Sequence, residues 1–468
     1  MQNTNLGDGK MIEQILNLLE NKALKELREL VEEINAIDLA PVFEELEPNE
    51  QVLLFRLLPK ELAAETFVEL DGEMQESLIL KFSDKELKAV VDELYLDDAV
   101  DIIEEMPAGI VKKILRGADA ETRKAINELL KYPKDSAGSI MTPEYIDLKK
   151  HMTVHEAFER IRKVGIDKET IYTCYVTDAR RHLEGVVSIR ELLLADENDN
   201  IEDIMETNVI YAGTLDDKED AARLFNKYDF SVIPVVDKEH RLVGIVTVDD
   251  AIDVIEEENT EDIEKMAAII STDKPYLKTG IFSTVKNRIP WLLILMLSAT
   301  FTGAIISSFE NKLKSIVVLT AFIPMLMGTG GNSGSQSSVT IIRGLSLGEI
   351  RIKDMLKVVF KELRVGFLCG IILGAINFIK ILCIDYALIG AFQGYSFNET
   401  LMITSVICIT LALTVLVAKL VGSVLPIVAE AVKVDPAVMA SPFITTIVDA
   451  ISLLIYFGMA NLILSAIM

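Results

Sequence analysis

The chain has few of the residues that build disulfide frameworks and zinc sites. Its 468 residues include only four cysteines and four histidines. The cysteines form no C-x-x-C pair, and the histidines are scattered, so we expect neither disulfides nor a zinc site. Three of the cysteines lie in apolar segments, which predicts core or lipid-phase thiols in a reducing environment. These residues are Cys174, Cys369, Cys383, Cys408, His151, His155, His182 and His240.

Motifs for secretion and for enzymatic chemistry are also missing. Met1–Lys10 has no basic stretch followed by an apolar core, so we expect no signal peptide. The glycine-rich stretch GTGGNSGSQ is not followed by Gly-Lys-Ser/Thr and is therefore no nucleotide-binding loop. Neither a nucleophile–base pair nor an ATP-hydrolysis motif stands out. We predict that the protein is not an enzyme.

Acidic and apolar residues are concentrated in different parts of the chain. The formal charge is −26, yet residues 279–468 contain 13 Lys/Arg and 9 Asp/Glu, so residues 1–278 hold the whole acidic excess. An acidic soluble part argues against nucleic acid as a partner. It suits cations, or it is only a well-solvated surface.

Five apolar segments follow the acidic part. Three uncharged runs lie between Arg288 and Glu310, Lys314 and Arg343, and Glu399 and Lys419. The other two segments, 364–385 and 436–468, are interrupted only by Lys380 and Asp449. A spanning helix needs about 20 residues. Because all five segments reach about that length, we predict five membrane helices.

The basic loops predict an orientation. Six Lys/Arg lie between the second and third segments, and two precede the first, so these sides should be cytosolic. The loop from Asp385 to Glu399 lacks Lys and Arg, as expected outside. The acidic domains are then cytosolic and the C-terminus is external.

The acidic part divides into a helical domain and an internal repeat. Residues 11–131 place apolar residues at helical spacing with short breaks, which predicts stacked helices. YVTDARRHLEGVVSIREL (175–192) and PVVDKEHRLVGIVTVDDA (234–251) align with each other without a gap. Each unit has two predicted strands and should pack against the other. The repeat resembles a tandem pair of CBS domains, in which Ser188, Glu191, Thr247 and Asp250 occupy nucleotide-binding positions. A module without a ligand is the alternative.

The stretch PMLMGTGGNSGSQ (324–336) is unusually polar for a membrane segment. Gly330 and Gly334 form a G-x-x-x-G spacing that could simply let helices approach closely. Alternatively, Pro324 and the glycines break the helix and free carbonyl oxygens for a hard cation. Asp449 is a carboxylate in the last segment. Lys380 and Lys419 are expected near the ends of their own segments, and no Lys or Arg is expected deep enough in any of the five segments to pair with Asp449. An unpaired buried carboxylate must protonate or hold a cation, and Mg²⁺ uses one or two carboxylates while keeping water.

PMLMGTGGNSGSQ, DPA…SPFITTIVDA, the repeat and the helical domain together resemble the MgtE family of magnesium channels. The resemblance implies a multidomain membrane protein: a cytosolic α-helical N-domain, a tandem CBS (α+β) pair, a connecting helix and a five-helix transmembrane domain. The boundaries are 1–134 for the N-domain, 135–200 and 201–254 for the CBS domains, 255–286 for the connecting, plug-like helix, and 287–468 for the membrane domain.

The resemblance also implies site residues, with Mg²⁺ as the ion and a homodimer as the assembly. Asp449 would face a pore on the two-fold axis near Gly331, Asn332 and Gly334, with Asp435 near its cytosolic mouth. Mg²⁺ bound to cytosolic carboxylates would close the pore. Those sensor groups are Glu65, Asp97, Asp101, Asp217, Glu219, Asp229, Asp250, Asp253, Glu258, Glu261 and Asp262. Asp97 and Asp101 are independently spaced to share one helix face.

The main interpretation is a Mg²⁺-selective channel of the cell membrane with feedback gating, with ATP as a possible ligand of the CBS pair. A carrier, or a pore for Co²⁺, Mn²⁺ or Ca²⁺, is the first alternative. The second is an adenine-nucleotide sensor that the apolar segments anchor to the membrane.

Overall fold

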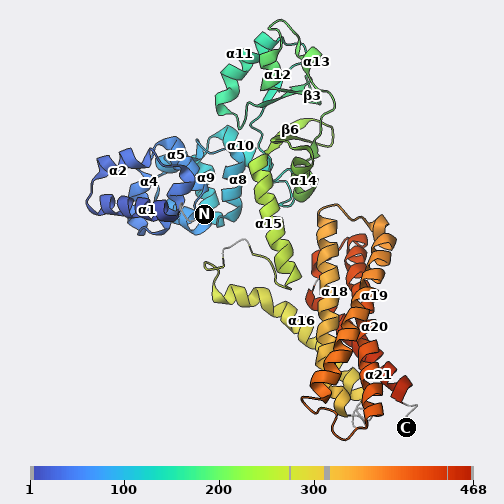
Figure 1. The fold of residues 1–468 in the computed structure, drawn as a ribbon. Helices are drawn as coiled ribbons and strands as arrows, with labels where there is room; N and C mark the ends of the chain where they lie inside the picture. Colours follow the sequence, from blue (N-terminus) through green and yellow to red (C-terminus); the bar gives the residue numbers. More distant parts are fainter. Residues whose placement is uncertain (1–4, 273–275, 310–316, 440, 465–468) are drawn as a thin grey trace. The chain divides into compact units, whose positions relative to one another are not determined.

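The computed structural model describes residues 5–272, 276–309, 317–439 and 441–464. The chain forms two compact units, Met1–Ile255 and Glu256–Met468. The first contains an α-helical domain and two small sheets, and the second is helical (Figure 1). Helix α15 (Val248–Met266) begins in the first unit and ends in the second.

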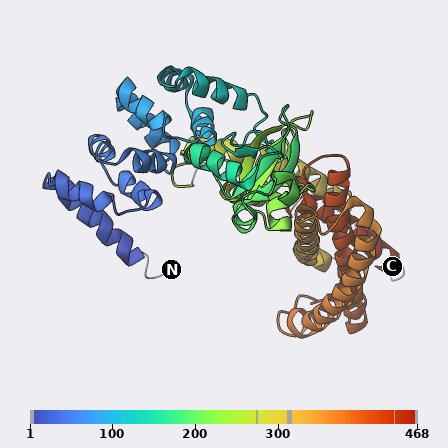
Figure 2. The same ribbon diagram turned by 90° about the horizontal axis from the view of Figure 1, so that it is seen from above.

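Within the described residues, the N-terminal domain is a row of ten short helices, which follow one another in sequence order (Figures 1 and 2). They are α1 (Asn5–Glu20), α2 (Leu24–Val31), α3 (Ala36–Glu44), α4 (Pro48–Phe55), α5 (Lys60–Val68), α6 (Gly72–Lys81), α7 (Asp84–Val91), α8 (Leu96–Glu105), α9 (Ala108–Gly117) and α10 (Ala120–Leu129). The predicted stacked helices are therefore confirmed.

From α3 onward the helices begin at a constant spacing along the chain. Asp71 and Ser83 accept backbone N–H groups of the following helix turn, as good N-cap side chains do. Pro59 and Pro107 occupy the same position before α5 and α9. The full set of evenly spaced N-caps is Asn35, Glu47, Pro59, Asp71, Ser83, Tyr95, Pro107 and Asp119.

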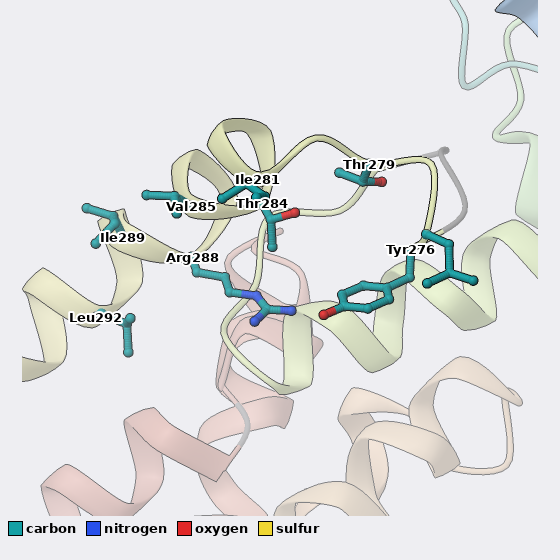
Figure 3. Close-up of a pocket in the computed structure, with 9 residues that line it drawn as sticks. Tyr276, Thr279, Ile281, Thr284, Val285, Arg288, Ile289 and Leu292 are labelled. Carbon is teal, nitrogen blue, oxygen red and sulfur yellow. The ribbon is translucent and has the colours of Figure 1, made fainter.

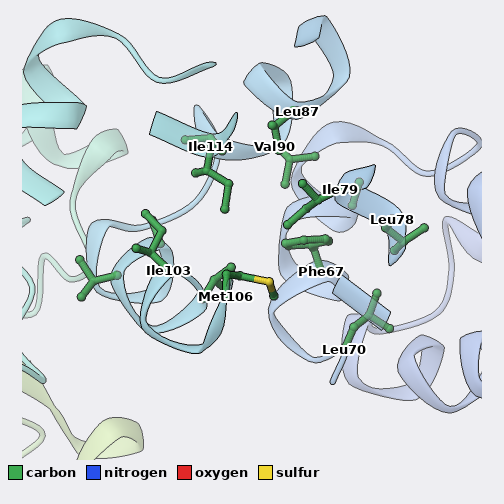
Figure 4. Packing of buried hydrophobic residues seen from close by; sticks show 14 of the residues in the cluster. Phe67, Leu70, Leu78, Ile79, Leu87, Val90, Ile103, Met106 and Ile114 are labelled. Carbon is green, nitrogen blue, oxygen red and sulfur yellow. The ribbon is translucent and has the colours of Figure 1, made fainter. Parts of the chain in front are cut away.

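The same period sets the core of this domain. Buried apolar side chains recur with the spacing of the N-caps, and alternate helices such as α3 and α5, or α5 and α7, pack against each other. Two buried glutamines at equivalent positions of α4 and α6 make the same bond: the Nε2 atoms of Gln51 and Gln75 donate to the carbonyls of Phe43 and Phe67 at 2.9 Å. Figure 4 shows Phe67, Ile79 and Ile103 of the recurring series in this core.

Two three-stranded sheets form the CBS pair. One contains β1 (Ile146–Leu148), β2 (Thr173–Thr177) and β3 (Leu183–Ser188), and the other β4 (Ala212–Gly213), β5 (Val232–Val236) and β6 (Leu242–Thr247). In each sheet the first strand is parallel and the third antiparallel to the middle one. The helices are α11 (Val154–Val164), α12 (Ile189–Leu194), α13 (Ile201–Ile204) and α14 (Lys218–Tyr228). The four predicted strands are confirmed, and β1 and β4 were not predicted.

The two sheets pack together through equivalent contacts, as the repeat predicts. Leu183 N donates to His240 O at 3.2 Å, and Leu242 N donates to Arg181 O at 2.9 Å. These pairs exchange roles when one unit of the repeat is aligned on the other. A buried cluster that includes Tyr175 contains residues of both units of the repeat. Each sheet is therefore covered on one face by the other sheet.

The second unit is a helical bundle. Its long helices are α16 (Ile281–Ser308), α18 (Ile323–Ser346), α19 (Met355–Lys380), α20 (Phe397–Ala431) and α21 (Ser441–Leu464). Short turns η2 (Val317–Phe322), η3 (Ile352–Asp354) and η5 (Pro436–Met439) and a π-helical turn η4 (Ile381–Tyr386) connect or extend them. Helix α18 packs against both α20 and α21, and α19 packs against α20.

Four segments of the described residues are long and apolar enough to cross a membrane. They are Ile281–Ser308, Ile352–Tyr386, Phe397–Ala431 and Pro436–Leu462. The remaining predicted span, which is the second in sequence order, coincides largely with α18. The glycines and hydroxyl side chains of α18 lower its mean hydropathy. The start of that predicted span, at residues 315–316, lies outside the described residues. The fifth crossing stays a prediction.

The connecting helix predicted over 255–286 is not one helix. Helix α15 ends at Met266, and α16 begins at Ile281. Ala268, at φ 56°, follows the last turn of α15 in the left-handed conformation that ends helices. The prediction missed this stop because the residue in the left-handed conformation is Ala268 and not the glycine that usually marks a helix end.

Candidate cation-binding sites

The glycines of α18 form the face on which α21 lies. A Cβ on Gly331 would lie 2.8 Å from Cγ2 of Thr445, and one on Gly334 would lie 2.8 Å from Cγ2 of Ile444. Only glycine permits helix backbones to come so near. The segment of α21 held in this way leads directly into Asp449.

Asp449 is half-buried in α21. Its Oδ1 atom is buried and has no hydrogen-bond partner among the described residues. The hydroxyls of Ser333 in α18 and Thr414 in α20 are likewise buried without a partner there. Buried polar atoms ordinarily find partners, so a carboxylate oxygen in this position is a candidate ligand for a cation.

Helix α18 is continuous, which corrects the expectation of a broken helix. Pro324 stands in its first turn, where the missing N–H costs no hydrogen bond. The glycines serve close packing instead of freeing carbonyl oxygens. Asn332, predicted beside the pore, is exposed on this chain, whereas Gly331 and Gly334 are buried.

Lys419 does not lie near a helix end, contrary to prediction. Helix α20 continues well beyond it to Ala431, and the lysine is only 6% exposed. Lys380 does lie at the end of α19 and pairs with Asp385 at 2.9 Å. The misplacement arose because the first charged residue after an uncharged run was taken as the boundary.

Asp435 lies just before η5, next to the end of α15. It accepts a hydrogen bond from the backbone of Ala437 at 2.8 Å and pairs with Lys265 Nζ at 2.6 Å. The same lysine pairs with Glu261 at 2.7 Å. Asp262 accepts from Ser346 Oγ at 3.2 Å, and burial together with the charge of Asp435 raises the pKa of Asp262. Of the predicted cation ligands, Glu261 and Asp435 thus pair with Lys265, and Asp262 lies beside them.

A second acidic group lies in the first unit. Ligand oxygens of Asp97, Glu144 and Glu169 all lie within 4.8 Å of one another. Asp97 stands in the first turn of α8, and Leu96 N of that turn donates to Glu144 Oε2 at 3.3 Å. Asp97 is 9% exposed, and its Oδ1 and the Oε2 of Glu169 are buried without a partner among the described residues.

The electrostatics of this acidic cluster are unfavourable. Burial, followed by the charges of Asp250 and Asp98, raises the pKa of Asp97 well above its usual range. Burial and the charges of Asp249 and Asp250 raise the pKa of Glu169 to about 7. Burial raises the pKa of Asp98 and of Asp250 to about 6, with neighbouring carboxylates adding to both shifts. Carboxylates that repel one another in this way favour a bound cation.

Only part of the predicted sensor set joins this cluster. Asp97 and Asp250 belong to it or lie beside it, whereas Asp98, Glu144 and Glu169 were not among the predicted residues. Glu144 and Glu169 stand in irregular segments, where periodicity gives no signal. The remaining residues lie elsewhere: Glu65 on α5, Asp101 on α8, Asp217, Glu219 and Asp229 at the ends of α14, and Asp253 and Glu258 on α15.

The residues predicted to hold a nucleotide make local bonds. Ser188 caps α12 and donates through Oγ to Glu191 Oε2 at 2.8 Å. Thr247 Oγ1 donates to Asp250 Oδ2 at 2.6 Å at the start of α15. These bonds stabilise helix starts in both repeats, and a nucleotide ribose would compete with them.

A cavity of about 440 Å³ lies along the first turns of α16. Figure 3 shows Arg288 directed toward the ring of Tyr276 across it. Among the described residues its lining contains no carboxylate, so this cavity matches neither of the acidic sites.

Comparisons with known proteins decide the family. The divalent cation transporter family matches residues 323–459, the MgtE intracellular N domain matches 34–135, and the CBS domain matches 137–198 and 201–257. The magnesium transporter MgtE of Thermus thermophilus is 37% identical over 462 residues, covering 98% of this chain and 99% of the relative. The chain belongs to the MgtE family. The Bacillus subtilis magnesium transporter MgtE is 33% identical over 461 residues and covers 98% of each chain.

Solved structures match the cytosolic part of MgtE. The cytosolic domain of the Mg²⁺ channel MgtE in complex with ATP is 38% identical, with a TM-score of 0.50, and covers 52% of this chain and 99% of that one. The soluble part of a magnesium transporter is 32% identical, with a TM-score of 0.51, and covers 54% and 99%. MgtE is a family of membrane transporters and not of enzymes, and the predicted order of helical domain, CBS pair and apolar spans is confirmed.

Proposed function

We propose that the chain is a Mg²⁺-selective channel of the cell membrane, assembled as a homodimer and closed by Mg²⁺ bound to its cytosolic domains. The pore assignment rests on one observation: the Oδ1 of Asp449 is buried and has no partner among the described residues, next to the segment of α21 that packs on the glycine face of α18. A single carboxylate among neutral oxygens suits a divalent ion that keeps part of its water.

A two-fold assembly would strengthen this preference. Two symmetry-related Asp449 carboxylates near one axis repel each other, and a divalent ion relieves that repulsion better than K⁺ does. In this proposal Asn332, exposed on the single chain, faces the axis, and Gly331 and Gly334 act by letting α21, which carries Asp449, pack against α18. Asp435 lies at the cytosolic mouth.

The closing signal is proposed to act at the acidic cluster of Asp97, Glu144 and Glu169, with Asp98 and Asp250 beside it. Mg²⁺ there would convert repulsion between the N-domain and the CBS pair into attraction and favour one arrangement of the two. Further carboxylates on α5, α14 and α15 complete the predicted sensor. The acidic domains are cytosolic and the C-terminus is external in this proposal.

Mg²⁺ uptake into liposomes that contain the purified full chain tests the pore. We expect uptake by the unaltered chain and none by Asp449→Asn, because the neutral amide cannot offset a divalent charge. Glu430→Gln, at an exposed position of α20, is the matched control and should transport normally. Equal uptake by Asp449→Asn and the unaltered chain would remove Asp449 from the pathway.

The same preparation separates the other candidates. Uptake that follows an imposed voltage without a co-ion indicates a channel, and competition by Co²⁺, Mn²⁺ or Ca²⁺ measures selectivity. A nucleotide-sensing role is favoured by one observation, the ATP bound in the solved cytosolic domain of an MgtE channel. ATP binding that survives Asp449→Asn, in a chain that never conducts Mg²⁺, would favour the sensor over the channel.

A further inference from the structure

Lys419 is an unusually placed cation. It lies within α20 and is 6% exposed, in a helix whose length and composition suit a membrane span. An ammonium group in such a segment is costly on insertion scales, by about 2.5–3.5 kcal/mol at the centre of a span. It ordinarily lies there because a specific partner offsets the cost, and lysines in membrane segments usually mark a functional site.

The partner is reached through a hydroxyl group. Lys419 Nζ lies 3.4 Å from Ser337 Oγ, and Ser337 Oγ donates to Glu362 Oε2 at 2.6 Å. A carboxylate only accepts, so the single hydroxyl proton points to Glu362 and a lone pair of Ser337 remains for the ammonium. The three side chains are thus linked by two hydrogen bonds, and the positive charge of Lys419 is offset by the negative charge of Glu362.

These three residues join three helices at a place where α18 and α20 pack closely. Ser337 belongs to α18, Lys419 to α20 and Glu362 to α19. Gly334 lies one helical turn before Ser337, and Gly422 lies one turn after Lys419. A Cβ on Gly422 would overlap the carbonyl oxygen of Gly334.

The polar chain is continuous with the contacts around Asp449. Gly334, one turn from Ser337, packs on Ile444 and Val448 of α21, and Val448 directly precedes Asp449. Ser338, which follows Ser337 in α18, donates through Oγ to the carbonyl of Met439 in η5 at 2.9 Å. Movement of α18 at Ser337 therefore displaces the segment on which Asp449 lies.

We propose that Lys419 and Glu362, bridged by Ser337, are a charge pair that holds α18 in the position required for cation passage at Asp449. They are positioning residues, and the inference rests on the proposed channel function. Removing the carboxylate leaves the buried lysine without compensation, and removing the lysine leaves the half-buried Glu362 without its counter-charge, whereas removing both leaves no stranded charge.

A double-mutant cycle on the full chain in detergent and in liposomes tests this pair. Glu362→Gln and Lys419→Met should each lower the unfolding midpoint by about 5 °C or more and slow Mg²⁺ uptake by about tenfold or more. The double variant should recover most of both losses. Lys419→Arg keeps the charge and should retain more uptake than Lys419→Met.

The matched control is the pair of Lys357 Nζ and Asp354 Oδ1 at the start of α19, which are 2.7 Å apart and whose lysine is 83% exposed. Its single and double variants should show no coupling, because exposed pairs contribute little. Losses that simply add in the Glu362/Lys419 double variant would overturn the proposal. Unchanged uptake by folded Lys419→Met would also overturn it, since the lysine would then only stabilise the fold.

Two further readouts keep the test decisive. If Lys419→Met does not fold, Ser337→Ala takes its place: it breaks the bridge with both charges present and must slow uptake. The melting cycle needs no transport, so an unaltered chain that takes up no Mg²⁺ defeats the channel proposal, while the coupling still reports on the charge pair.

Discussion

Gly422 of α20 lies directly against the carbonyl oxygen of Gly334 in α18, with no room for a methyl group between them. We expect Gly422→Ala to destabilise the bundle by about 1–3 kcal/mol, since the opposing atom is backbone and cannot turn aside. Thermal unfolding of the full chain in detergent measures this. Gly328→Ala is the control. Gly328 lies in α18, the helix of Gly334, with open space where its Cβ would be, so this substitution should be neutral or slightly stabilising. Equal effects of the two substitutions would contradict this packing.

The acidic cluster predicts that neutralisation and Mg²⁺ act in the same direction. In residues 1–266 expressed alone, Asp97→Asn or Glu169→Gln should raise the unfolding midpoint without divalent ions, because a mutually repelling charge is removed. The same variants should gain less from added Mg²⁺, since a ligand is lost. Glu128→Gln on the exposed face of α10 is the control. A full Mg²⁺-induced shift in Glu169→Gln would exclude that residue as a ligand.

The raised pKa values predict that this segment, without divalent ions, becomes more stable as the pH falls. Glu169, with a folded pKa of about 7, and Asp98 and Asp250, at about 6, bind protons in the folded state before their unfolded counterparts do. Between about pH 8 and about pH 5 the folded state therefore holds more protons, and stability decreases as the pH rises through the folded pKa values. Allowing for partial solvent exposure, we expect a gain of about 1–2 kcal/mol at about pH 5.5 over about pH 8.

Urea unfolding of the same segment at the two pH values measures that gain. Glu169→Gln should flatten the pH dependence, and saturating Mg²⁺ should do so as well, because a bound cation keeps the carboxylates ionised. A stability that rises with pH over this range would show that the carboxylate pKa values are not raised in the folded state.

Lys265 predicts an effect on gating. It pairs with Asp435 at 2.6 Å and with Glu261 at 2.7 Å, joining the end of α15 to the bundle. If the proposed channel closes through α15, Lys265→Met should weaken this attachment and leave uptake faster at Mg²⁺ concentrations that close the unaltered chain. Lys361→Met, at an exposed position of α19, is the control. Closure at the same Mg²⁺ concentration in both variants would argue against a role for this contact.

The order of domains and the CBS strands could be predicted because each leaves a strong local pattern: a gapless internal repeat, short runs rich in β-branched residues, and long uncharged runs. The acidic cluster could be predicted only in part. Asp97 and Asp250 lie on regular helices, whereas Glu144 and Glu169 reach it from irregular segments through tertiary packing. Lys419 was misplaced because α20 continues through LVGSVLPIVAEA, an apolar stretch that supports helix beyond the charge.

The period of the N-terminal domain was present in the sequence and was not used. Phe43, Phe55 and Phe67 reveal it, and Leu46, Leu58 and Leu70 repeat it one helical turn later. The period is obscured because the recurring positions accept different apolar side chains, such as Ile79 and Val91, and because the N-caps vary among Asn, Glu, Pro, Asp, Ser and Tyr. The core selects size and apolarity at these positions more than identity.

This regular spacing has a consequence for how the domain can change in length. Since alternate helices contact each other, excising two successive helices between equivalent N-caps, such as Asp71 and Tyr95, would bring together helix ends that already share one geometry. Excising a single helix would place every later helix on the opposite side of the row. The N-terminal helical domain can therefore be shortened or extended in pairs of helices. Its length changes in fixed steps, and the packing of its interior is kept.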